Sequence, residues 1–182
     1  DLDGLRLAQL TDIHFGPFFR RKEPERAVSM ANECRPHLTL VTGDLITRSG
    51  DNLEGCLRVL RGLRAEAGLF GCHGNHEEYA EVMDLATMLG AEQGLRFLRG
   101  EAEGLRFGQA TLNLAGHDYQ HLDLPPMPGA EGLVRPGAFN VVVQHNPAVF
   151  PRAAEVGFDL MLSGHTHGGQ INLSVLGADL SV

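Results

Sequence analysis

Aspartate, asparagine and histidine recur at five places along the chain, each directly after a short apolar run. Each run is typical of a buried strand. The runs are Leu5–Leu10, Leu38–Thr42, Leu69–Cys72, Val141–Gln144 and Leu160–Leu162. Because ligands of open α/β sheets bind where strands end at their carboxyl edge, these positions indicate a metal site with chemistry in it. The candidate ligands are Asp12, His14, Asp44, Asn75, His145, His165 and His167.

Two pairs of these residues are separated by a single residue. Asp12 and His14 alternate with Ile13. In an extended segment both polar side chains would point to the same side, while Ile13 would face the core. His165 and His167 bracket one residue in the same way. Two histidines on one extended segment could each reach a different metal.

Asp44 stands alone after Gly43, where a missing side chain lets the backbone turn tightly. A carboxylate can bridge two cations through its two oxygens, which would explain a single aspartate at this point. Asn75 adds a neutral carbonyl oxygen. Imidazole and carboxylate ligands without a thiolate suit two divalent ions of Mn, Fe, Zn, Ni or Co. Any one histidine alone would more often be a satisfied polar residue, but the whole set favours a metal site.

The length and composition predict one globular domain over residues 1–182. Hydrophobic residues make up 43% of the chain and charged residues 21%, which is ordinary for a globular protein. The net charge of -8 disfavours a broad nucleic-acid-binding face, so extended nucleic acid is not expected as a partner. Cys34, Cys56 and Cys72 form no CxxC pair and are interpreted as small apolar residues.

No run approaches the roughly 20 apolar residues of a membrane span, and no signal peptide is visible. The chain begins at Asp1 rather than Met, so it is interpreted as a fragment of a longer protein. The expected location is cytoplasmic, or membrane-associated through an N-terminal segment outside this sequence. The oligomeric state is left open.

Strand signals alternate with helix signals, which favours α/β layers. Leu105–Phe107 and Thr111–Leu114, joined around Gly108 and Gln109, indicate an antiparallel hairpin and hence a mixed sheet. The stretch Leu122–Gly137 is rich in proline and glycine, and a surface loop is favoured there over a substrate-gating flap. Helices are predicted from Pro24 to Pro36, over Asn52–Glu66, and from His76 to a stop at Gly90.

The ordered motifs resemble those of the calcineurin-like metallophosphoesterases, and in particular their bacterial YkuE/YaeI-like phosphodiesterase branch. The resemblance extends from Leu5 to Gln170. The motifs that carry it are Asp12-x-His14, Gly43-Asp44, Gly74-Asn75-His76, His145-Asn146 and Gly164-His165-Thr166-His167.

This resemblance implies an α/β fold of four layers, an α/β/β/α sandwich with mixed β-sheets, and a dinuclear site between its loops. Relatives continue beyond Gln170 with further strands, so C-terminal strands are expected to be missing here. His76 matches the non-ligand histidine that assists the leaving group. By motif position, the first metal would be held by Asp12, His14, Asp44 and His167, and the second by Asp44, Asn75, His145 and His165.

The expected function is metal-dependent hydrolysis of a phosphoester or pyrophosphate, most simply a phosphodiester. Two cations roughly 3.5–4 Å apart would activate a bridging hydroxide for in-line attack, with His76 assisting the leaving group. No Ser or Cys lies in a recognisable triad setting. The alternatives are an interaction module on the same fold with little turnover, which the complete ligand set disfavours, and a nuclease, which the acidic charge disfavours.

An aromatic and basic lip follows the first ligand strand, and could hold a phosphate or a lipid headgroup. The expected partner is therefore a small phosphodiester or a lipid-headgroup-type substrate. A loop anchored by apolar side chains beside a solvated charge run explains the lip equally well. His117 follows a strand end and is a further candidate contact, whereas His73 and His121 match no ligand position. The lip consists of Phe15, Phe18, Phe19, Arg20, Arg21 and Lys22.

Overall fold

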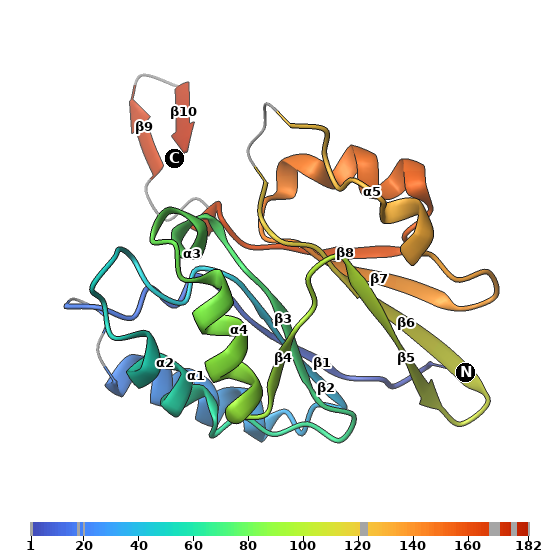
Figure 1. The fold of residues 1–182 in the computed structure, drawn as a ribbon, viewed down its shortest axis with the longest axis horizontal. Coiled ribbons are helices and arrows are strands. Elements are labelled where there is room, and N and C mark those ends of the chain that lie inside the picture. The colour runs from blue at the N-terminus through green and yellow to red at the C-terminus, as the bar shows by residue number, and fades with distance from the viewer. Residues whose placement is uncertain are drawn as a thin grey trace.

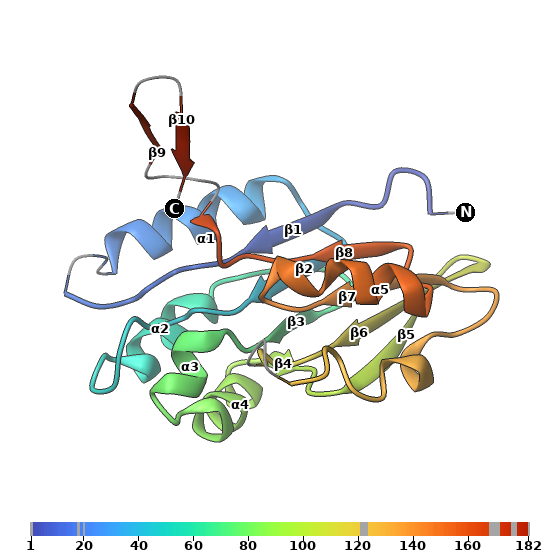
Figure 2. The ribbon, with the colours of Figure 1, turned by 90° about the horizontal axis from the view of Figure 1, so that it is seen from above.

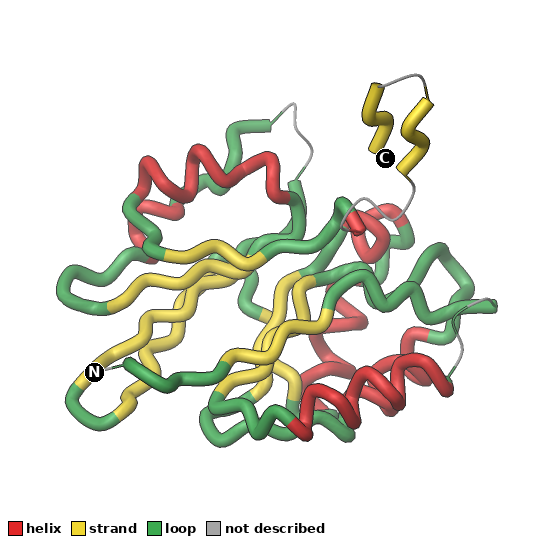
Figure 3. Tube along the Cα trace, turned by 180° about the vertical axis from the view of Figure 1, so that it is seen from behind, coloured by secondary structure: helices red, strands yellow, loops and turns green. Residues whose placement is uncertain are grey.

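Two four-stranded sheets lie face to face, with helices on the outer side of each (Figure 1). Seen from behind, the sheets lie between two groups of helices (Figure 3). The expected four-layer sandwich is therefore confirmed. The computed structural model describes residues 2–17, 19, 21–120, 124–167, 172–175 and 178–181, the last two segments by their backbone alone.

The first sheet is parallel throughout and runs in the order β1-β2-β3-β4. β2 and β3 have the expected bounds. β1 begins two residues later than expected, because a turn precedes it in which the Leu5 N–H donates to the Leu2 carbonyl. The sequence pattern does not predict β4, which is only three residues long. The strands are β1 (Leu7–Leu10), β2 (Leu38–Thr42), β3 (Leu69–Cys72) and β4 (Leu95–Phe97).

The second sheet is mixed and runs in the order β5-β6-β7-β8. The expected hairpin is confirmed, since β5 and β6 pair antiparallel on either side of Gly108, which has a φ of 61°. β6, β7 and β8 are parallel to one another. β8 has the expected bounds, and β7 begins two residues earlier than expected. The strands are β5 (Glu101–Phe107), β6 (Ala110–Gly116), β7 (Phe139–Val143) and β8 (Leu160–Leu162).

Three helices cover the outer face of the first sheet and share one core with it (Figure 2). The helix predicted to start at Asn52 does so because the Asn52 side chain accepts the Gly55 N–H at 2.8 Å, which caps its first turn. It ends at Leu60 rather than Glu66, although Leu63 still packs into the same core. The three helices are α1 (Lys22–Glu33), α2 (Leu53–Leu60) and α4 (Met83–Glu92).

The single helix predicted after His76 is wrong, because the segment forms two helices. The short α3 (Asn75–Tyr79) ends before Glu81, whose φ of 57° separates it from α4. Gly90 does not stop α4 but lies inside it. A Cβ there would meet the Phe97 ring at 2.6 Å, so glycine allows the helix to pack closely on β4.

The outer face of the second sheet is covered by α5 (Phe150–Val156) and by a 3₁₀ turn, η1 (Ala130–Leu133). A second 3₁₀ turn, η2 (Pro147–Val149), leads into α5. The stretch 122–137 is thus not only a surface loop, since Met127 and Ala130 are fully buried in this core. Residues 122 and 123 lie outside the described residues. A gating role for this stretch stays a prediction.

Alternation along the inner strands produces the layers. On β7, Val141 and Val143 pack between the two sheets, whereas Val142 packs under α5. On β2, Leu40 faces the neighbouring sheet and Val41 faces the helices of the first layer. Successive side chains of a strand point to opposite faces of its sheet, so a strand buried on both faces contributes to two cores. The molecule therefore has three cores, one between the two sheets and one under each helical layer.

Cys56 and Cys72 are buried and Cys34 is exposed, and all three are free thiols. β9 (Asn172–Val175) and β10 (Ala178–Ser181) pair antiparallel with each other. Within the described residues, every helix is too short or too polar to span a bilayer.

His73 is a buried titratable group directly after β3. Its ring stacks on Phe97 with centroids 4.2 Å apart, and its Nε2 lies 2.8 Å from the Thr87 hydroxyl. Burial, reinforced by the nearby Arg99 charge, lowers the pKa of His73 to about 3. The folded protein therefore keeps this imidazole neutral at pH values where the unfolded chain protonates it.

This difference predicts that His73 makes the metal-free protein less stable as pH falls below about 6.5. Between that value and about 3 the unfolded state binds one more proton, so the free energy of unfolding falls by up to about 1.4 kcal/mol per pH unit. His73→Gln should reduce the wild-type slope by the contribution of this one group, measured by urea unfolding in chelator at pH 7.5 and 5. Thr87→Val should lower stability at both pH values but keep the slope. A wild-type slope in His73→Gln would contradict the prediction.

Candidate metal centre

The seven candidate ligands follow strands of both sheets and meet where those strands end. Loops after β1, β2 and β3 of the first sheet and after β7 and β8 of the second supply them. Two groups have ligand atoms that all lie within 4.8 Å of one another, and Asp44 belongs to both. The first group is Asp12, His14, Asp44 and His167, and the second is Asp44, His145 and His165.

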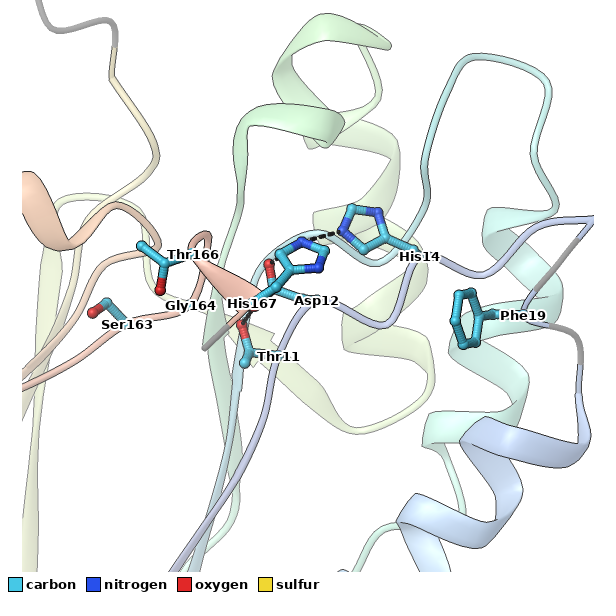
Figure 4. A pocket seen from close by; sticks show the side chains of 8 residues that line it. All are labelled: Thr11, Asp12, His14, Phe19, Ser163, Gly164, Thr166 and His167. Carbon is cyan, nitrogen blue, oxygen red and sulfur yellow. Dashed lines mark hydrogen bonds and ion pairs between the residues drawn. The ribbon is translucent and has the colours of Figure 1, made fainter. Parts of the chain in front are cut away.

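In the first group, the two histidines face each other beside Asp12 (Figure 4). His14 Nε2 lies 3.1 Å from His167 Nε2 and 3.7 Å from Asp44 Oδ2. His167 Nε2 lies 3.4 Å from Asp12 Oδ1. Ring nitrogens and carboxylate oxygens thus converge on one small region, where they can share a cation.

The second group lies deeper. His145 is fully buried, and its Nε2 lies 3.0 Å from Asp44 Oδ2. Asn75 joins this group through its amide oxygen, which lies 2.8 Å from His165 Nδ1. The structure therefore brings all seven candidate ligands together around the shared Asp44 carboxylate.

The backbone at these strand ends is unusual. Eight non-glycine residues of the described chain have positive φ, and five of them are candidate ligands. Such conformations cost of order 1–3 kcal/mol each and cluster at functional sites. The five are Asp12 (53°), His14 (46°), Asp44 (54°), His165 (73°) and His167 (51°).

These angles correct the expectation of extended Asp-x-His and His-x-His segments. Ile13 does pack against the core, as predicted. Asp12 and His14, however, reach the centre because each adopts the left-handed region, not because side chains alternate along a strand. The same holds for His165 and His167.

Glycines allow the loops to approach closely. Gly43, with a φ of 94°, confirms the tight turn expected before Asp44. A Cβ on Gly43 would lie 2.7 Å from His145 Nδ1. A Cβ on Gly164 would lie 2.4 Å from Asp12 Oδ2. Side chains at these positions would displace candidate ligands from the centre.

Asp44 is the electrostatic centre of the arrangement. Burial by itself would raise the pKa of Asp44, but the attraction of His145 and the N–H that His76 donates at 3.0 Å lower it overall. Burial would lower the pKa of His145, and the charge of Asp44 raises it instead. Burial and neighbouring imidazoles lower the pKa of His14 and of His165. A buried carboxylate beside imidazoles such as His14 and His165, whose pKa is lowered, is a good metal-ligand set.

His145 is oriented for ligation through Nε2. Its Nδ1 lies 2.6 Å from the Thr42 carbonyl, which requires that nitrogen to carry the proton. In the neutral imidazole Nε2 is then a buried lone pair 3.0 Å from Asp44 Oδ2, and the attraction of that carboxylate raises the pKa of His145 because it favours a proton between the two atoms. A cation between these two acceptors would satisfy both, so the residues present fit a metal.

His76 lies at the margin of the centre. Its Nδ1 lies 2.5 Å from the Thr47 carbonyl, so Nδ1–H donates there and Nε2 turns toward Asp44, 3.9 Å away. Its ring meets that of His14 edge-on, with centroids 4.7 Å apart. This position is next to the two ligand groups without belonging to either.

Glu77, which the sequence pattern did not single out, connects two of the ligand loops. Its buried carboxylate accepts the N–H groups of Asp44 at 2.9 Å, Leu45 at 2.7 Å and Gly74 at 2.8 Å. Burial raises the pKa of Glu77, and these backbone donors act against that rise. The Gly-Asn-His-Glu motif contained a signal, because an acid at the third helical position commonly reaches back to the helix start.

Of the expected lip, Phe19 lines the cavities beside the centre, and the other described candidate contacts lie elsewhere. Arg21 pairs with Glu25 at 2.6 Å and lines a separate pocket with Phe15. His117 is buried, with its Nε2 3.3 Å from the Pro128 carbonyl. Phe18, Arg20 and His121 lie outside the described residues.

The sequence profile of the calcineurin-like phosphoesterase family matches residues 5–169. The chain therefore belongs to this family of metal-dependent phosphoester hydrolases. Similar curated proteins include the metallophosphoesterase YkuE of Bacillus subtilis, 26% identical over 178 residues, and a transmembrane protein with metallophosphoesterase domain of Danio rerio, 30% identical over 183 residues. These matches cover 96% and 93% of this chain, but only 62% and 42% of the relatives.

Solved structures share the fold at low sequence identity. The NAD nucleotidase NadN of Haemophilus influenzae aligns with 90% of this chain and 38% of its own, at a TM-score of 0.60 and 14% identity. The phosphopantetheinyl hydrolase PptH of Mycobacterium tuberculosis aligns with 96% of this chain and 86% of its own, at a TM-score of 0.50 and 14% identity. These likenesses establish the fold alone.

Glu77 provides a prediction about the ligand loops. In Glu77→Gln, an amide N–H₂ group replaces one carboxylate oxygen and faces backbone N–H groups that are themselves donors. Buried N–H groups that Glu77 satisfies would then lack an acceptor. We expect the free energy of unfolding to fall by about 3 kcal/mol in urea titrations, and Mn²⁺ affinity by calorimetry to weaken. Glu92→Gln, at the exposed end of α4, is the matched control and should change neither. Wild-type stability and affinity in Glu77→Gln would show that the carboxylate does not hold the loops.

Proposed function

We propose that this chain is a dinuclear metal-dependent phosphodiesterase acting on small phosphodiesters or lipid-headgroup-type substrates. The observation that carries the proposal is the pair of ligand groups joined at the single buried Asp44. In this assignment Asp44 bridges two divalent ions. The first ion is held by Asp12, His14, Asp44 and His167, and the second by Asp44, Asn75, His145 and His165.

The ions would supply Lewis acidity toward the phosphoryl oxygens and an activated water. Mn, Fe, Zn, Ni and Co all suit this donor set. The chain's own residues fix where the ligands point. Asp12 accepts the His165 N–H at 3.0 Å, and Asp44 accepts the His76 N–H at 3.0 Å, so each carboxylate also holds a neighbouring loop in place. The centre is thereby preorganised before substrate binds.

His76 is proposed to donate a proton to the departing oxygen. The Thr47 carbonyl occupies its Nδ1–H, so Nε2 is the nitrogen that faces the centre. A protonated Nε2 there could reach an oxygen leaving from phosphorus. In this role His76 acts beside the metal ligands rather than as one of them.

The net charge of -8 supports small substrates over long polynucleotides, because few basic residues could follow a phosphate backbone. The Danio rerio relative is named as a transmembrane protein, so membrane association of the whole protein is proposed beside a cytoplasmic location. An interaction module with little turnover is the alternative. It would be expected to lack a ligand or His76, and this chain has the full set.

The proposal predicts a leaving-group dependence for His76. An alkoxide must be protonated as it departs, whereas a nitrophenolate needs little help. His76→Ala should keep near-normal metal content and lose activity on the order of 10²–10⁴-fold on alkyl phosphodiesters, with a smaller loss on bis-nitrophenyl phosphate. Rates and elemental analysis on chelator-treated protein reloaded with Mn²⁺ measure both quantities.

Asn75→Ala is the control, since loss of a ligand should reduce the metal content and slow both esters together. Equal losses on both esters in His76→Ala would remove its proton-donor role. A wild-type rate that Mn²⁺ does not raise above that of the chelated protein would contradict the proposed function itself.

A further inference from the structure

Two cavities flank the candidate metal centre, and they differ in chemistry. Each has a volume of about 460 Å³, within the roughly 300–1,000 Å³ of small-molecule pockets. His14, Phe19 and His167 line both, so the centre lies between them. A substrate whose phosphorus sits at the centre could place one ester arm in each cavity.

The wall of the first cavity is more polar than that of the second. Thr11, Ser163 and Thr166 line it together with the Asp12 carboxylate, as Figure 4 shows. The second cavity is mostly apolar and lies on the side of the loop after β2. Its wall includes Gly16, Pro17, the Phe19 ring, Thr47 and Arg48, whose guanidinium lies 3.9 Å from Asp51 Oδ1. The two arms of a phosphodiester would therefore meet different surroundings.

His76 lines the apolar cavity, and among the described residues it is not part of the polar cavity's wall. Its orientation comes from Thr47, which lines the same apolar cavity. A proton donor must lie within hydrogen-bond reach of the oxygen that departs. The ester arm in the apolar cavity is therefore the one whose oxygen His76 can protonate.

We propose that the apolar cavity binds the leaving alcohol, so that the enzyme cleaves the ester bond to the more apolar arm of a mixed phosphodiester. This inference rests on the proposed function. In the step, a water oxygen bonds to phosphorus and the bond from phosphorus to the apolar alcohol oxygen breaks. That oxygen takes one proton and leaves as the alcohol, and the polar arm stays on the phosphomonoester.

Phe19 supplies the largest apolar side chain of this wall, and the residue is 54% exposed, so a bound group could cover its ring. Burying an apolar group against such a ring contributes free energy in proportion to the area removed from water. Phe150 is a matched control, because it is 59% exposed and lies on α5, outside both cavities.

The test uses the full chain loaded with Mn²⁺ and benzyl glyceryl phosphate, whose two ester oxygens both need protonation as they depart. The wild type should release benzyl alcohol and glycerol phosphate in roughly tenfold excess over benzyl phosphate and glycerol. Phe19→Ala should reduce this excess severalfold and raise KM, Phe19→Leu should restore most of it, and Phe150→Ala should match the wild type. Glycerol as the main released alcohol, or an unchanged product ratio in Phe19→Ala, would overturn the inference.

A binding measurement separates this inference from the proposed function. By calorimetry, benzylphosphonate should bind the Mn²⁺-loaded wild type roughly tenfold more tightly than methylphosphonate, and Phe19→Ala should lose that preference. If neither ester bond is cleaved but the preference for benzylphosphonate holds, the proposed function fails and the apolar site stands. Equal binding of the two phosphonates would overturn the apolar site.

Discussion

The buried Asp44 carboxylate is the constraint on which the rest of the centre depends. Its side chain is 2% exposed, and in the described chain its ion-pair partners are three imidazoles, those of His14, His76 and His145. A buried charge costs several kcal/mol unless it is compensated. The second buried acid, Glu77, adds to the negative charge nearby. Divalent ions among these ligands would offset both charges, so metal binding and stability of the centre are expected to be linked.

Strained backbone conformations in the ligand loops place the candidate ligands around Asp44. Parallel strands bring the ligand-bearing ends to one edge, but left-handed conformations at residues such as Asp12 and Asp44 turn the side chains inward. The cost is of order 1–3 kcal/mol per residue. Hydrogen bonds that cross between loops support it: Glu77 joins the loops after β2 and β3, and Asp12 accepts the His165 N–H from the loop after β8. The same side chains thus hold the backbone and supply the candidate ligands.

Much of this could be predicted from the sequence, because continuous apolar runs define strands such as Leu38–Thr42 and because parallel strands end at one edge. The positive φ angles could not, since alternation of polar residues suggests extended chain and the left-handed turn depends on packing between loops. Gly90 looked like a helix stop, yet it serves the contact with Phe97. The short α5 has only two turns, too few for a clear periodicity. The role of Glu77 could not be predicted either, because its carboxylate meets the backbone N–H groups of two loops only in the folded protein.

In the proposed function one buried carboxylate joins two metal ions. Crystals of the Mn²⁺-loaded protein, measured by anomalous diffraction across the manganese absorption edge, would reveal both ions. We expect two anomalous peaks roughly 3.5–4 Å apart, with the Asp44 oxygens between them, His14 and His167 on one peak, and His145 and His165 on the other. A single peak, or two peaks of which one does not contact Asp44, would show that Asp44 does not bridge two ions.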